Sequence, residues 1–354
     1  MADQDSLNLG FIGAGDICRT RHLPGLAKIP GVSVVAVCNR TRASSEAVAA
    51  DFGITAIEED WRRLLGRDDV DGVFIGTWPY MHREISIAAL EAGKHVFCQA
   101  RMCMDLAEAR QMLAAAEARP DLVNMICPPP TRMPFEPWVR KAIQEGHLGQ
   151  ITAIELISTS GANLNRQSLH WRECVNYSGK QAMAMGIYAE TLNAWVGPYE
   201  ELSARISIPI ATKTDEEGRE ASIGVPQVVH ITGKLESGVL ALERHMGIAV
   251  DRTTTSDQFT VWGLEGTIRY RFGDMIEYAG SGEALAPVDV PADMQRHWMV
   301  EQDFIDAVRA ARRGVSLGDR RVSPDFAEGL RYMQKVEAVY GAASSGQSIK
   351  LSEL

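Results

Sequence analysis

The first residues whose spacing could do chemistry lie near the start of the chain, in LNLGFIGAGDICRTRHLPGL. Gly13 and Gly15 follow a short apolar run, and Cys18 takes the third position of a Gly-x-Gly-x-x-Gly pattern, where it is small enough for close helix packing. The first glycine permits a tight turn from strand to helix, and the second lets the backbone approach a pyrophosphate at the helix N-terminus. The pattern predicts a dinucleotide site that uses Gly13, Gly15, Asp16 and Ile17.

The end of the next apolar run, VAVCNRTRAS, bears on the form of the dinucleotide. An NAD site usually carries Asp or Glu here to bind the ribose 2'-hydroxyl, whereas Asn39, Arg40 and Arg42 suit a 2'-phosphate. We therefore expect NADP. The alternative is NAD, with both arginines acting only as solvated residues at the start of a helix.

A sheet must position these residues, and the first part of the chain is patterned to form one. Short apolar runs rich in β-branched residues (LNLGFIG, VSVVAVCN, DGVFIGT, KHVFCQ) alternate with amphipathic stretches such as ASSEAVAADFG and REISIAALEAG. This alternation predicts an α/β Rossmann domain over residues 1–127, with a parallel, doubly wound sheet. The breaker Pro128-Pro129-Pro130 predicts the domain boundary.

Residues 128–354 have a different pattern. FEPWVRKAIQEGHLG predicts a helix, and later strand-like runs are joined by Ser-Gly and Glu-Gly turns, which are typical of hairpins. We expect an α+β domain with a large, mostly antiparallel open sheet for substrate binding and oligomerisation. Residues 212–220 predict an exposed polar loop, and residues 298–312 and 324–343 predict terminal helices that can pack back on the first domain.

The composition limits the classes of partner. A chain of 354 residues is long enough for two cores, and its net charge of -10 argues against a broad nucleic-acid-binding surface. The six cysteines are scattered without zinc spacing, so we expect no metal site. No apolar run is long enough for a membrane span, and the amino terminus lacks the pattern of a secretory signal. We expect a cytoplasmic protein with a small-molecule substrate.

Three stretches resemble the glucose-fructose oxidoreductase, inositol dehydrogenase and MocA (Gfo/Idh/MocA) family: GFIGAGDIC, FIGTWPYMHREISIAALEAGKHVFCQA and HWRECVNYSGKQAMAMGIYAETLNAWVG. His82, followed eight residues later by LEAGKHV, is a specific part of this pattern. The resemblance implies a Rossmann domain followed by an open-sheet domain whose exposed face serves in homodimer or homotetramer contacts. It also implies hydride transfer between a nicotinamide and a carbon-bound hydroxyl of a sugar or cyclitol, with Thr77, His82 and Gln99 near the cofactor.

The catalytic set implied by this resemblance is absent from its usual positions. Active relatives carry Lys in Glu-Lys-Pro, and Asp and His spaced Asp-x-x-x-His, which places both on one helical face. The Lys position falls on Ala100 of Gln99-Ala100-Arg101, and the helix pair falls on Ala184 and Tyr188. Because acid–base help is worth about 10²- to 10⁴-fold in rate, a dehydrogenase of this kind must move its proton through other groups.

Four residues are candidates to replace that set. Tyr188 takes the His position and can exchange a proton if a neighbouring cation lowers its pKa, or else it only packs its ring. Arg101 can clamp a carboxylate, polarise a carbonyl or pair with a nearby acid. Lys180 can restore an amine if the turn before Ala184 is helical, and is otherwise an exposed loop residue. His170 has a reference pKa near neutrality, or is simply structural.

Trp171, Arg172 and Arg166 are the candidate substrate-binding residues. The resemblance implies that the Trp-Arg pair lines the substrate pocket, and the concentration of arginines favours an anionic substrate. The alternative is that these are ordinary surface arginines.

Two classes of function stay open. The cofactor turn favours an NAD(P)-dependent oxidoreductase that acts on a sugar-like, cyclitol or other hydroxylated, possibly anionic molecule through a non-standard proton-transfer residue. The triple replacement favours a non-redox protein, either a nucleotide-bound lyase, hydrolase or isomerase or a cofactor-binding protein. Turnover of a nicotinamide cofactor separates the two.

Overall fold

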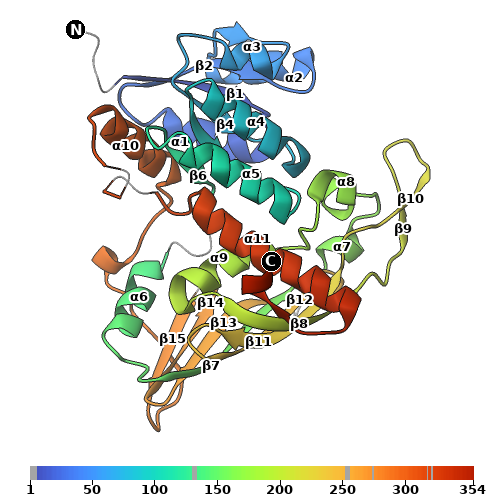
Figure 1. Cartoon of the computed structure of the whole chain (residues 1–354), viewed down its shortest axis with the longest axis vertical. Coiled ribbons are helices and arrows are strands. Elements are labelled where there is room, and N and C mark those ends of the chain that lie inside the picture. The colour runs from blue at the N-terminus through green and yellow to red at the C-terminus, as the bar shows by residue number, and fades with distance from the viewer. Residues whose placement is uncertain (1–5, 130–133, 252–255, 273–274, 317, 320–321) are drawn as a thin grey trace. The chain divides into compact units, whose positions relative to one another are not determined.

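The computed structural model describes residues 6–129, 134–251, 256–272, 275–316, 318–319 and 322–354 (Figure 1). They form two compact units. The first comprises Met1–Pro128 and Met299–Leu330, and the second comprises Pro129–Trp298 and Arg331–Leu354. The predicted boundary at Pro128-Pro129-Pro130 falls partly outside the described residues.

A six-stranded parallel sheet forms the centre of the first unit, in the order β3-β2-β1-β4-β5-β6. Strands β4 and β5 are buried along their whole length, as expected for apolar runs that are covered on both faces. The strands are β1 (Leu7–Ile12), β2 (Val32–Cys38), β3 (Ala56–Ile57), β4 (Gly72–Ile75), β5 (His95–Cys98) and β6 (Asn124–Ile126).

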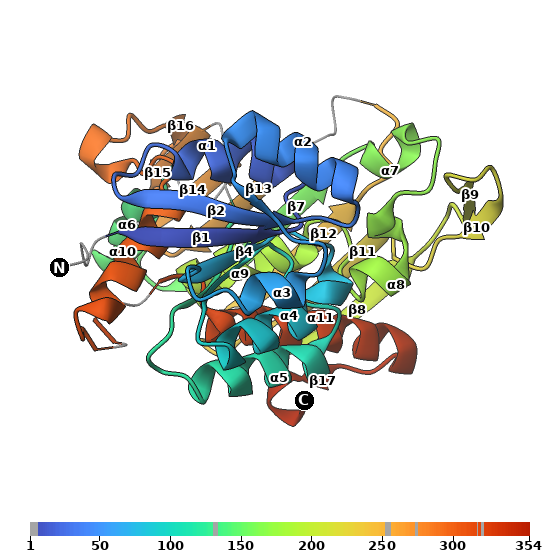
Figure 2. The ribbon, with the colours of Figure 1, turned by 90° about the horizontal axis from the view of Figure 1, so that it is seen from above.

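Helices cover both faces of this sheet, with α1 and α2 on one side of β1 and β2 and α3, α4 and α5 on the other (Figure 2). The side chains of Thr41, Asp60 and Asp105 accept hydrogen bonds from backbone N–H groups at the starts of α2, α3 and α5. The arrangement confirms the predicted doubly wound fold. The helices are a π-helical turn (Cys18–His22) that continues as α1 (Leu23–Leu26), α2 (Arg42–Phe52), α3 (Trp61–Leu65), α4 (Pro79–Glu91) and α5 (Leu106–Glu117).

Helix α10 (Val300–Arg312) belongs to the first unit although it lies far along the chain. Its Phe304 packs edge-on against Phe74 of β4 and Phe97 of β5, with ring centroids 5.3 and 5.7 Å apart. Phe74 and Phe97 stack on each other at 4.3 Å. All three rings are buried, so this aromatic cluster anchors the later segment to the sheet.

A nine-stranded sheet forms the centre of the second unit, in the order β16-β15-β14-β13-β7-β12-β11-β8-β17. Only the β7–β12 pair among these described strands is parallel, which confirms the predicted mostly antiparallel sheet. The strands are β7 (Ile151–Thr159), β8 (Tyr199–Ser207), β11 (Val228–Leu235), β12 (Leu240–Met246), β13 (Ser256–Gly263), β14 (Gly266–Arg271), β15 (Met275–Gly280), β16 (Ala286–Pro287) and β17 (Ile349–Lys350).

Helices α9 (Met185–Val196) and α11 (Phe326–Ser345, from Arg331 onward) cover one face of this sheet, while the other face stays open. The strands alternate accordingly, so that Glu243 and His245 of β12 are buried and Leu240 and Leu242 are exposed. The remaining short helices are α6 (Glu136–Gln144), α7 (Ala162–Asn165), α8 (Val175–Ser178) and 3-10 turns at Trp171–Glu173, Ala292–Met294 and Leu351–Glu353.

The segment 212–220 is not the simple loop that its polarity predicted. Its ends pair as a two-stranded ribbon of β9 (Thr212–Thr214) and β10 (Glu220–Ser222). The Asp215 carboxylate closes the turn by accepting hydrogen bonds from the backbone N–H groups of Glu217 and Arg219, both at 2.9 Å. This local closure allows the β-branched residues before it to pair.

No helix within the described ranges is long and apolar enough to cross a membrane.

Candidate functional site

The glycine turn brings the ends of β1 and β4 into direct contact. Gly13 has a φ of +82°, and a Cβ atom built on it would lie 2.6 Å from the Thr77 backbone nitrogen, so a side chain would clash there. A Cβ atom built on Gly76, at the end of β4, would likewise clash with the Gly13 carbonyl oxygen and the Cys18 Sγ atom. Burial raises the pKa of the Cys18 thiol to about 12, which makes it a packing residue. Gly15 faces open space, so a ligand can approach its backbone.

A cleft of about 630 Å³ opens at this turn. The Thr77 hydroxyl is buried there and makes no hydrogen bond within the described chain. Open backbone at the start of a helix suits a pyrophosphate, and an unused hydroxyl beside it suits a polar ligand group, so the donor set fits a dinucleotide. The predicted cofactor residues that line the cleft are Gly13, Gly15, Asp16, Asn39, Arg40 and Thr77.

Asn39, at the end of β2, holds the glycine turn in place. Its side-chain oxygen accepts a hydrogen bond from the Ala14 backbone N–H at 2.7 Å, and its amide donates to the Ser44 carbonyl at 3.1 Å. Its own backbone N–H donates to the Ser45 hydroxyl at 2.9 Å. A neutral amide therefore connects the turn to the start of α2, where NAD sites usually carry a carboxylate.

Arg40 and Arg42 differ in what they contact. Arg40 lines the cleft, and its guanidinium lies 5.9 Å from the centre of the Trp78 ring. No ion pair of Arg40 is recorded among the described residues. Arg42 is exposed, lies outside the cleft lining and pairs with the carboxylates of Glu46 and Glu59, both at 2.8 Å. The first arginine is therefore the one available to an anionic ligand.

Ile17, His82 and Gln99 are three further predicted cofactor residues that do not line the cleft. His82 is fully buried, with one ring nitrogen 2.8 Å from the Thr77 carbonyl oxygen and the other 2.8 Å from that of Arg101. Burial lowers the pKa of His82, and the carbonyl contacts oppose that effect. His82 thus connects the loops after β4 and β5 and positions Thr77 from behind.

The altered triplet Gln99-Ala100-Arg101 is buried at its first and last residues, and its Ala100–Arg101 peptide bond is cis. The Gln99 amide donates to a ring nitrogen of His22, whose other nitrogen bonds to the Glu301 carboxylate of α10. The Arg101 carbonyl accepts from His82. The triplet is therefore part of a buried polar chain within the first unit.

Tyr188, on α9 of the second unit, lies among aromatic rings beside a carboxylate. Its ring stacks on Phe272 with centroids 4.5 Å apart and planes within 5°. The Asp257 carboxylate of β13 lies near enough for its charge to act on the Tyr188 hydroxyl. Burial raises the pKa of Tyr188 well above its usual 10, and the Asp257 charge raises it further. Proton exchange at Tyr188 was expected to need a neighbouring cation that lowers this pKa, whereas the neighbouring charge is an anion.

Sequence reasoning missed Asp257, although a signal was present. In the strand DQFTVW, Asp257 has the same alternation phase as Phe259 and Val261, both buried. An acid in the phase of core residues indicates a carboxylate on the covered face of the sheet.

Lys180 and His170 are held by contacts of their own. The Lys180 ammonium pairs with the Glu337 carboxylate of α11, and α9 begins only at Met185, so the turn before Ala184 is not helical. His170 Nδ1 accepts from the Arg172 backbone N–H at 3.3 Å and caps a 3-10 turn. No recorded contact joins Tyr188 to either residue within the described chain.

Arg172 lies over the Trp171 ring, and the charge of Arg166 acts on it. The Arg172 guanidinium lies 4.1 Å from the centre of the Trp171 ring. Desolvation by neighbouring groups and the charge of Arg166 lower the pKa of Arg172 to about 10, so it stays charged at neutral pH. No ion pair between either arginine and a described carboxylate is recorded.

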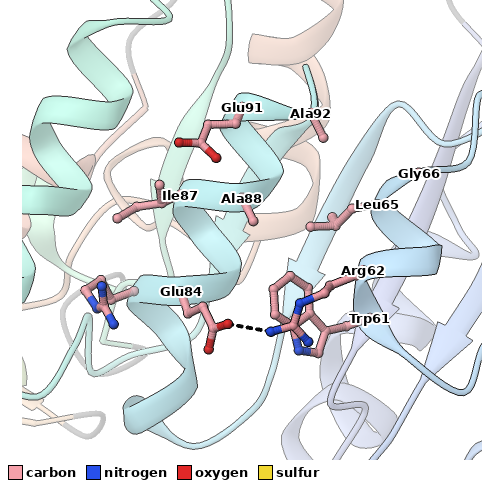
Figure 3. Close-up of a pocket in the computed structure, with 10 residues that line it drawn as sticks. Trp61, Arg62, Leu65, Gly66, Glu84, Ile87, Ala88, Glu91 and Ala92 are labelled. Carbon is pink, nitrogen blue, oxygen red and sulfur yellow. Dashed lines mark hydrogen bonds and ion pairs between the residues drawn. The ribbon is translucent and has the colours of Figure 1, made fainter.

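A second hollow, of about 490 Å³, lies between α3 and α4 (Figure 3). Its walls are held together by the Arg62 guanidinium, which bonds to the Glu84 carboxylate at 2.6 Å and lies over the Trp61 ring at 4.1 Å. Trp61 and Arg62 also line the cofactor cleft. Among the described residues, no cluster of three or more His, Cys, Asp or Glu side chains could hold a metal ion.

Residues 7–126 match a family model described as "Oxidoreductase family, NAD-binding Rossmann fold" (GFO_IDH_MocA). Levoglucosan dehydrogenase of Pseudarthrobacter phenanthrenivorans is 25% identical over 293 residues, 75% of this chain and 74% of that protein. A dTDP-3,4-didehydro-2,6-dideoxy-alpha-D-glucose 3-reductase of Streptomyces antibioticus is 26% identical, covering 95% and 97%. The 1,5-anhydro-D-fructose reductase of Ensifer adhaerens is 38% identical, covering 30% and 32%.

Solved structures agree on the fold. Levoglucosan dehydrogenase in complex with NADH and L-sorbose has a TM-score of 0.85 at 22% identity, covering 98% of this chain and 99% of that one. An oxidoreductase domain protein from Kribbella flavida has a TM-score of 0.86 at 21% identity, with the same coverage. The glycine turn and the parallel sheet agree with the family match: residues 7–126 carry the NAD-binding Rossmann fold of the Gfo/Idh/MocA oxidoreductases, and these relatives extend the similarity over both units.

Proposed function

We propose that this enzyme transfers hydride between a nicotinamide cofactor, NADP in preference to NAD, and a hydroxyl-bearing carbon of a sugar-like or cyclitol substrate. The observation that carries the proposal is the glycine cradle, where Gly13 and Gly76 exclude side chains and Gly15 leaves the backbone open. The names of the relatives, which refer to an anhydrosugar, an anhydro keto sugar and a dTDP-linked keto sugar, support the substrate class.

The preference for NADP rests on Arg40. A 2'-phosphate beside it would gain a charge-assisted hydrogen bond, which is worth about 1.5–3 kcal/mol. Three acids, Asp16, Glu59 and Asp60, also line this cleft. Glu59 pairs with Arg42, and Asp60 accepts the Arg62 backbone N–H at 2.9 Å. The charges of Glu59 and Asp60 are thus partly compensated. Arg19 and Arg62, the other arginines of the lining, pair with Asp51 and Glu84, which leaves Arg40 to bind the phosphate.

An anionic substrate is supported by Arg166 and Arg172. The charge of Arg166 lowers the pKa of Arg172, so the two guanidinium groups repel each other, and a bound carboxylate or phosphate would offset that repulsion. The stacked Trp171 ring offers an apolar surface for a sugar face. We therefore propose a substrate that carries both a sugar-like ring and a negative charge.

We place proton transfer on Tyr188, because the contacts of the other candidates give them other tasks. Lys180 is paired with Glu337, and His170 caps a turn. Arg101 stays a candidate for polarising or clamping the substrate. When bound, the nicotinamide supplies or accepts the hydride. The chain's own residues bind the phosphates through the glycine turn and exchange the proton of the reacting oxygen at the Tyr188 hydroxyl.

The test is a turnover assay that varies one charge at a time. The purified chain is mixed with NADP⁺ or NAD⁺ and with matched pairs of a neutral and an anionic sugar, such as glucose and glucuronate. Levoglucosan and cyclitols are tested as further neutral substrates, and nicotinamide reduction is followed by absorbance. We expect faster turnover with NADP⁺ and with the anionic member of each pair. Cofactor binding without reduction of any nicotinamide across the panel would contradict the oxidoreductase assignment.

The non-redox alternative keeps one specific observation in its favour, the replacement of three acid–base positions by Ala100, Ala184 and Tyr188. The same assay separates it, because its products can be analysed by mass spectrometry. Conversion of many sugar molecules without net reduction of the nicotinamide would favour a lyase, hydrolase or isomerase.

We also propose that the open face of the nine-stranded sheet forms a homodimer or homotetramer contact. Leu240, Leu242 and Trp262 are exposed large apolar side chains on this face, and apolar side chains gathered on an open sheet are typical of subunit contacts. Sedimentation of the wild type and of the Leu240→Lys/Leu242→Lys variant tests this. We expect the wild type to associate and the variant to sediment as a monomer, and a monomeric wild type would contradict the proposal.

A further inference from the structure

We infer that Lys213 of β9 is a positioning residue that sets the preference for a charged substrate: it holds the Glu173 carboxylate and thereby keeps the guanidinium groups of Arg166 and Arg172 available to an anion. The inference rests on the proposed function, which places an anionic, sugar-like substrate at these two arginines. The family model ends at residue 126, so it assigns no role to Lys213.

Lys213 and Glu173 form a buried ion pair. The Lys213 ammonium donates to Glu173 Oε1 at 2.7 Å, and the two side chains are only 6% and 2% exposed. Removal of one partner from such a pair leaves the other as a buried, uncompensated charge, which is unfavourable. A Glu173 carboxylate without Lys213 would therefore need another cation.

The Glu173 carboxylate is occupied by two donors. Its Oε1 accepts from Lys213, and its Oε2 accepts the His170 backbone N–H at 3.0 Å at the start of the 3-10 turn. Arg172, the residue before Glu173, is exposed and lies over the Trp171 ring, and no ion pair of Arg172 is recorded within the described part of the chain. An acid and a base that are adjacent in the sequence are thus kept from pairing.

Lys213 also fixes the helix that leads to Arg166. Its ammonium donates to the Asn163 carbonyl at 2.5 Å, and Asn163 lies in α7, whose C-cap residue is Arg166. The Asn163 backbone N–H donates to the Gly247 carbonyl at 2.8 Å, directly after β12. The charge of Arg166 lowers the pKa of Arg172, so the two guanidinium groups act on each other. One ammonium therefore contacts both segments that carry these arginines.

The ribbon of β9 and β10 brings Lys213 to these segments. The Thr214 carbonyl accepts the Leu169 backbone N–H at 2.8 Å, and Ser168 forms a parallel bridge with Thr214, so β9 lies along the chain that precedes the 3-10 turn. Thr212 and Thr214 are exposed, whereas the Lys213 side chain between them is buried, as strand alternation requires. The ribbon therefore presents the Lys213 ammonium to the Glu173 carboxylate.

The charge balance predicts what the loss of Lys213 does. The released Glu173 carboxylate pairs with the adjacent Arg172, and the positive charge that faces an anionic ligand falls by one. A charge-assisted contact is worth a factor of about ten or more in affinity, so the preference for an anion should fall by about that factor. Removal of the carboxylate as well should restore the preference, because the competing acid is gone. A pair that only held the ribbon in place would give no such recovery.

The first experiment measures the Arg172 guanidinium itself, without a substrate. Wild type, Lys213→Met, Glu173→Gln and the double variant are treated with phenylglyoxal, which reacts with uncharged guanidine, and modification of Arg172 is followed by peptide mass spectrometry. A carboxylate partner that raises the pKa of Arg172 by about 1 makes this reaction about tenfold slower. We expect that slowing in Lys213→Met alone. Arg219→Ala, which breaks an exposed ion pair with Asp215 in the same ribbon, is the matched control and should react as wild type does.

Two results of this experiment would overturn the inference. One is a wild-type rate of Arg172 modification in Lys213→Met, and the other is a slow rate that persists in the double variant, as a purely structural pair would give. Glu173→Gln keeps the test decisive if Lys213→Met does not fold, because it removes the carboxylate and leaves the cation. Its Arg172 should react at least as fast as in wild type, and a slower reaction would contradict the inference.

The second experiment measures substrate preference with NADP⁺, as the ratio of KM for glucose to KM for glucuronate. We expect this ratio to fall about tenfold in Lys213→Met, with kcat for glucose unchanged, and to return to the wild-type value in the double variant. An unchanged ratio in Lys213→Met, where wild type prefers glucuronate, would overturn the inference alone. A wild type that does not prefer glucuronate, or that reduces no nicotinamide, would contradict the proposed function instead, and the modification rates would still decide whether Lys213 keeps Glu173 from Arg172.

Discussion

The two units keep different parts of the family pattern. The first keeps the cofactor cradle nearly intact, from Gly13 and Gly15 to the amide that replaces an acid at Asn39. The second carries helix α9, with Ala184 and Tyr188 where the resemblance implies Asp and His. A phosphate cradle depends on a backbone conformation that almost no substitution of its glycines preserves. Proton transfer needs one suitable group at the reacting oxygen, and such a group can come from another element.

The largest expected effect concerns the stability of the second unit. Lys335 is buried, and its ammonium bonds to both Glu243 carboxylate oxygens at 2.6 and 2.7 Å, with Tyr199 donating to the same carboxylate at 2.7 Å. Lys335→Met would leave a buried carboxylate without its cation, at a cost of about 3–5 kcal/mol. Hydrogen exchange of the β12 amides measures this. Lys234→Met, which breaks an exposed pair with Glu200, is the control and should change little.

Acid pH should weaken the same unit. Burial alone would raise the pKa of Glu243, but Lys335 and His245 outweigh it and lower the pKa from the usual 4.5 to about 2. Because the folded-state value lies below the unfolded-state value, this contribution is full above about pH 4.5 and is lost as pH falls through about 2. Unfolding of wild type and Glu243→Gln across this range should show a steeper loss of stability in wild type. Parallel curves would count against the assignment.

In the first unit, a methyl group at the turn should abolish cofactor binding. Gly13→Ala places its Cβ atom against Thr77 at a positive φ, so we expect the Kd for NADPH to rise at least about 100-fold, or about 2.7 kcal/mol. Fluorescence titration measures the change. Gly15→Ala meets no atom within 4 Å in the protein, so it should fold normally and weaken binding through the ligand alone. Unchanged affinity in both variants would contradict the placement of the pyrophosphate.

A smaller effect tests the choice of cofactor. Arg40→Ala should raise KM for NADP⁺ about tenfold, the low end for a lost charge-assisted contact, and leave KM for NAD⁺ unchanged. Arg42→Ala is the matched control, because Arg42 is already paired with Glu46 and Glu59. Equal effects of the two variants, or an equal loss with both cofactors, would remove the argument for the 2'-phosphate.

The sequence predicts the two units unequally for physical reasons. Glycine spacing and β-branched runs are local signals, so the cradle and the parallel sheet follow from short stretches. The neighbours of Tyr188 depend on the register of β13 against β7 and on how α9 packs on the sheet, neither of which is local. The same limit applies to Lys180, whose distant partner Glu337 lies on α11, and to the turn chemistry of Asp215, which converts a polar loop into a ribbon.

The most direct test of the central claim is a single measurement on Tyr188→Phe, in which cofactor affinity and the rate of hydride transfer are determined together. Phenylalanine keeps the stacking on Phe272 and removes only the hydroxyl. We predict an unchanged Kd for NADPH and a kcat lower by about 10²- to 10⁴-fold, because the first unit is intact and the proton path is cut. A variant that keeps wild-type kcat would show that the proton travels elsewhere and would contradict the account.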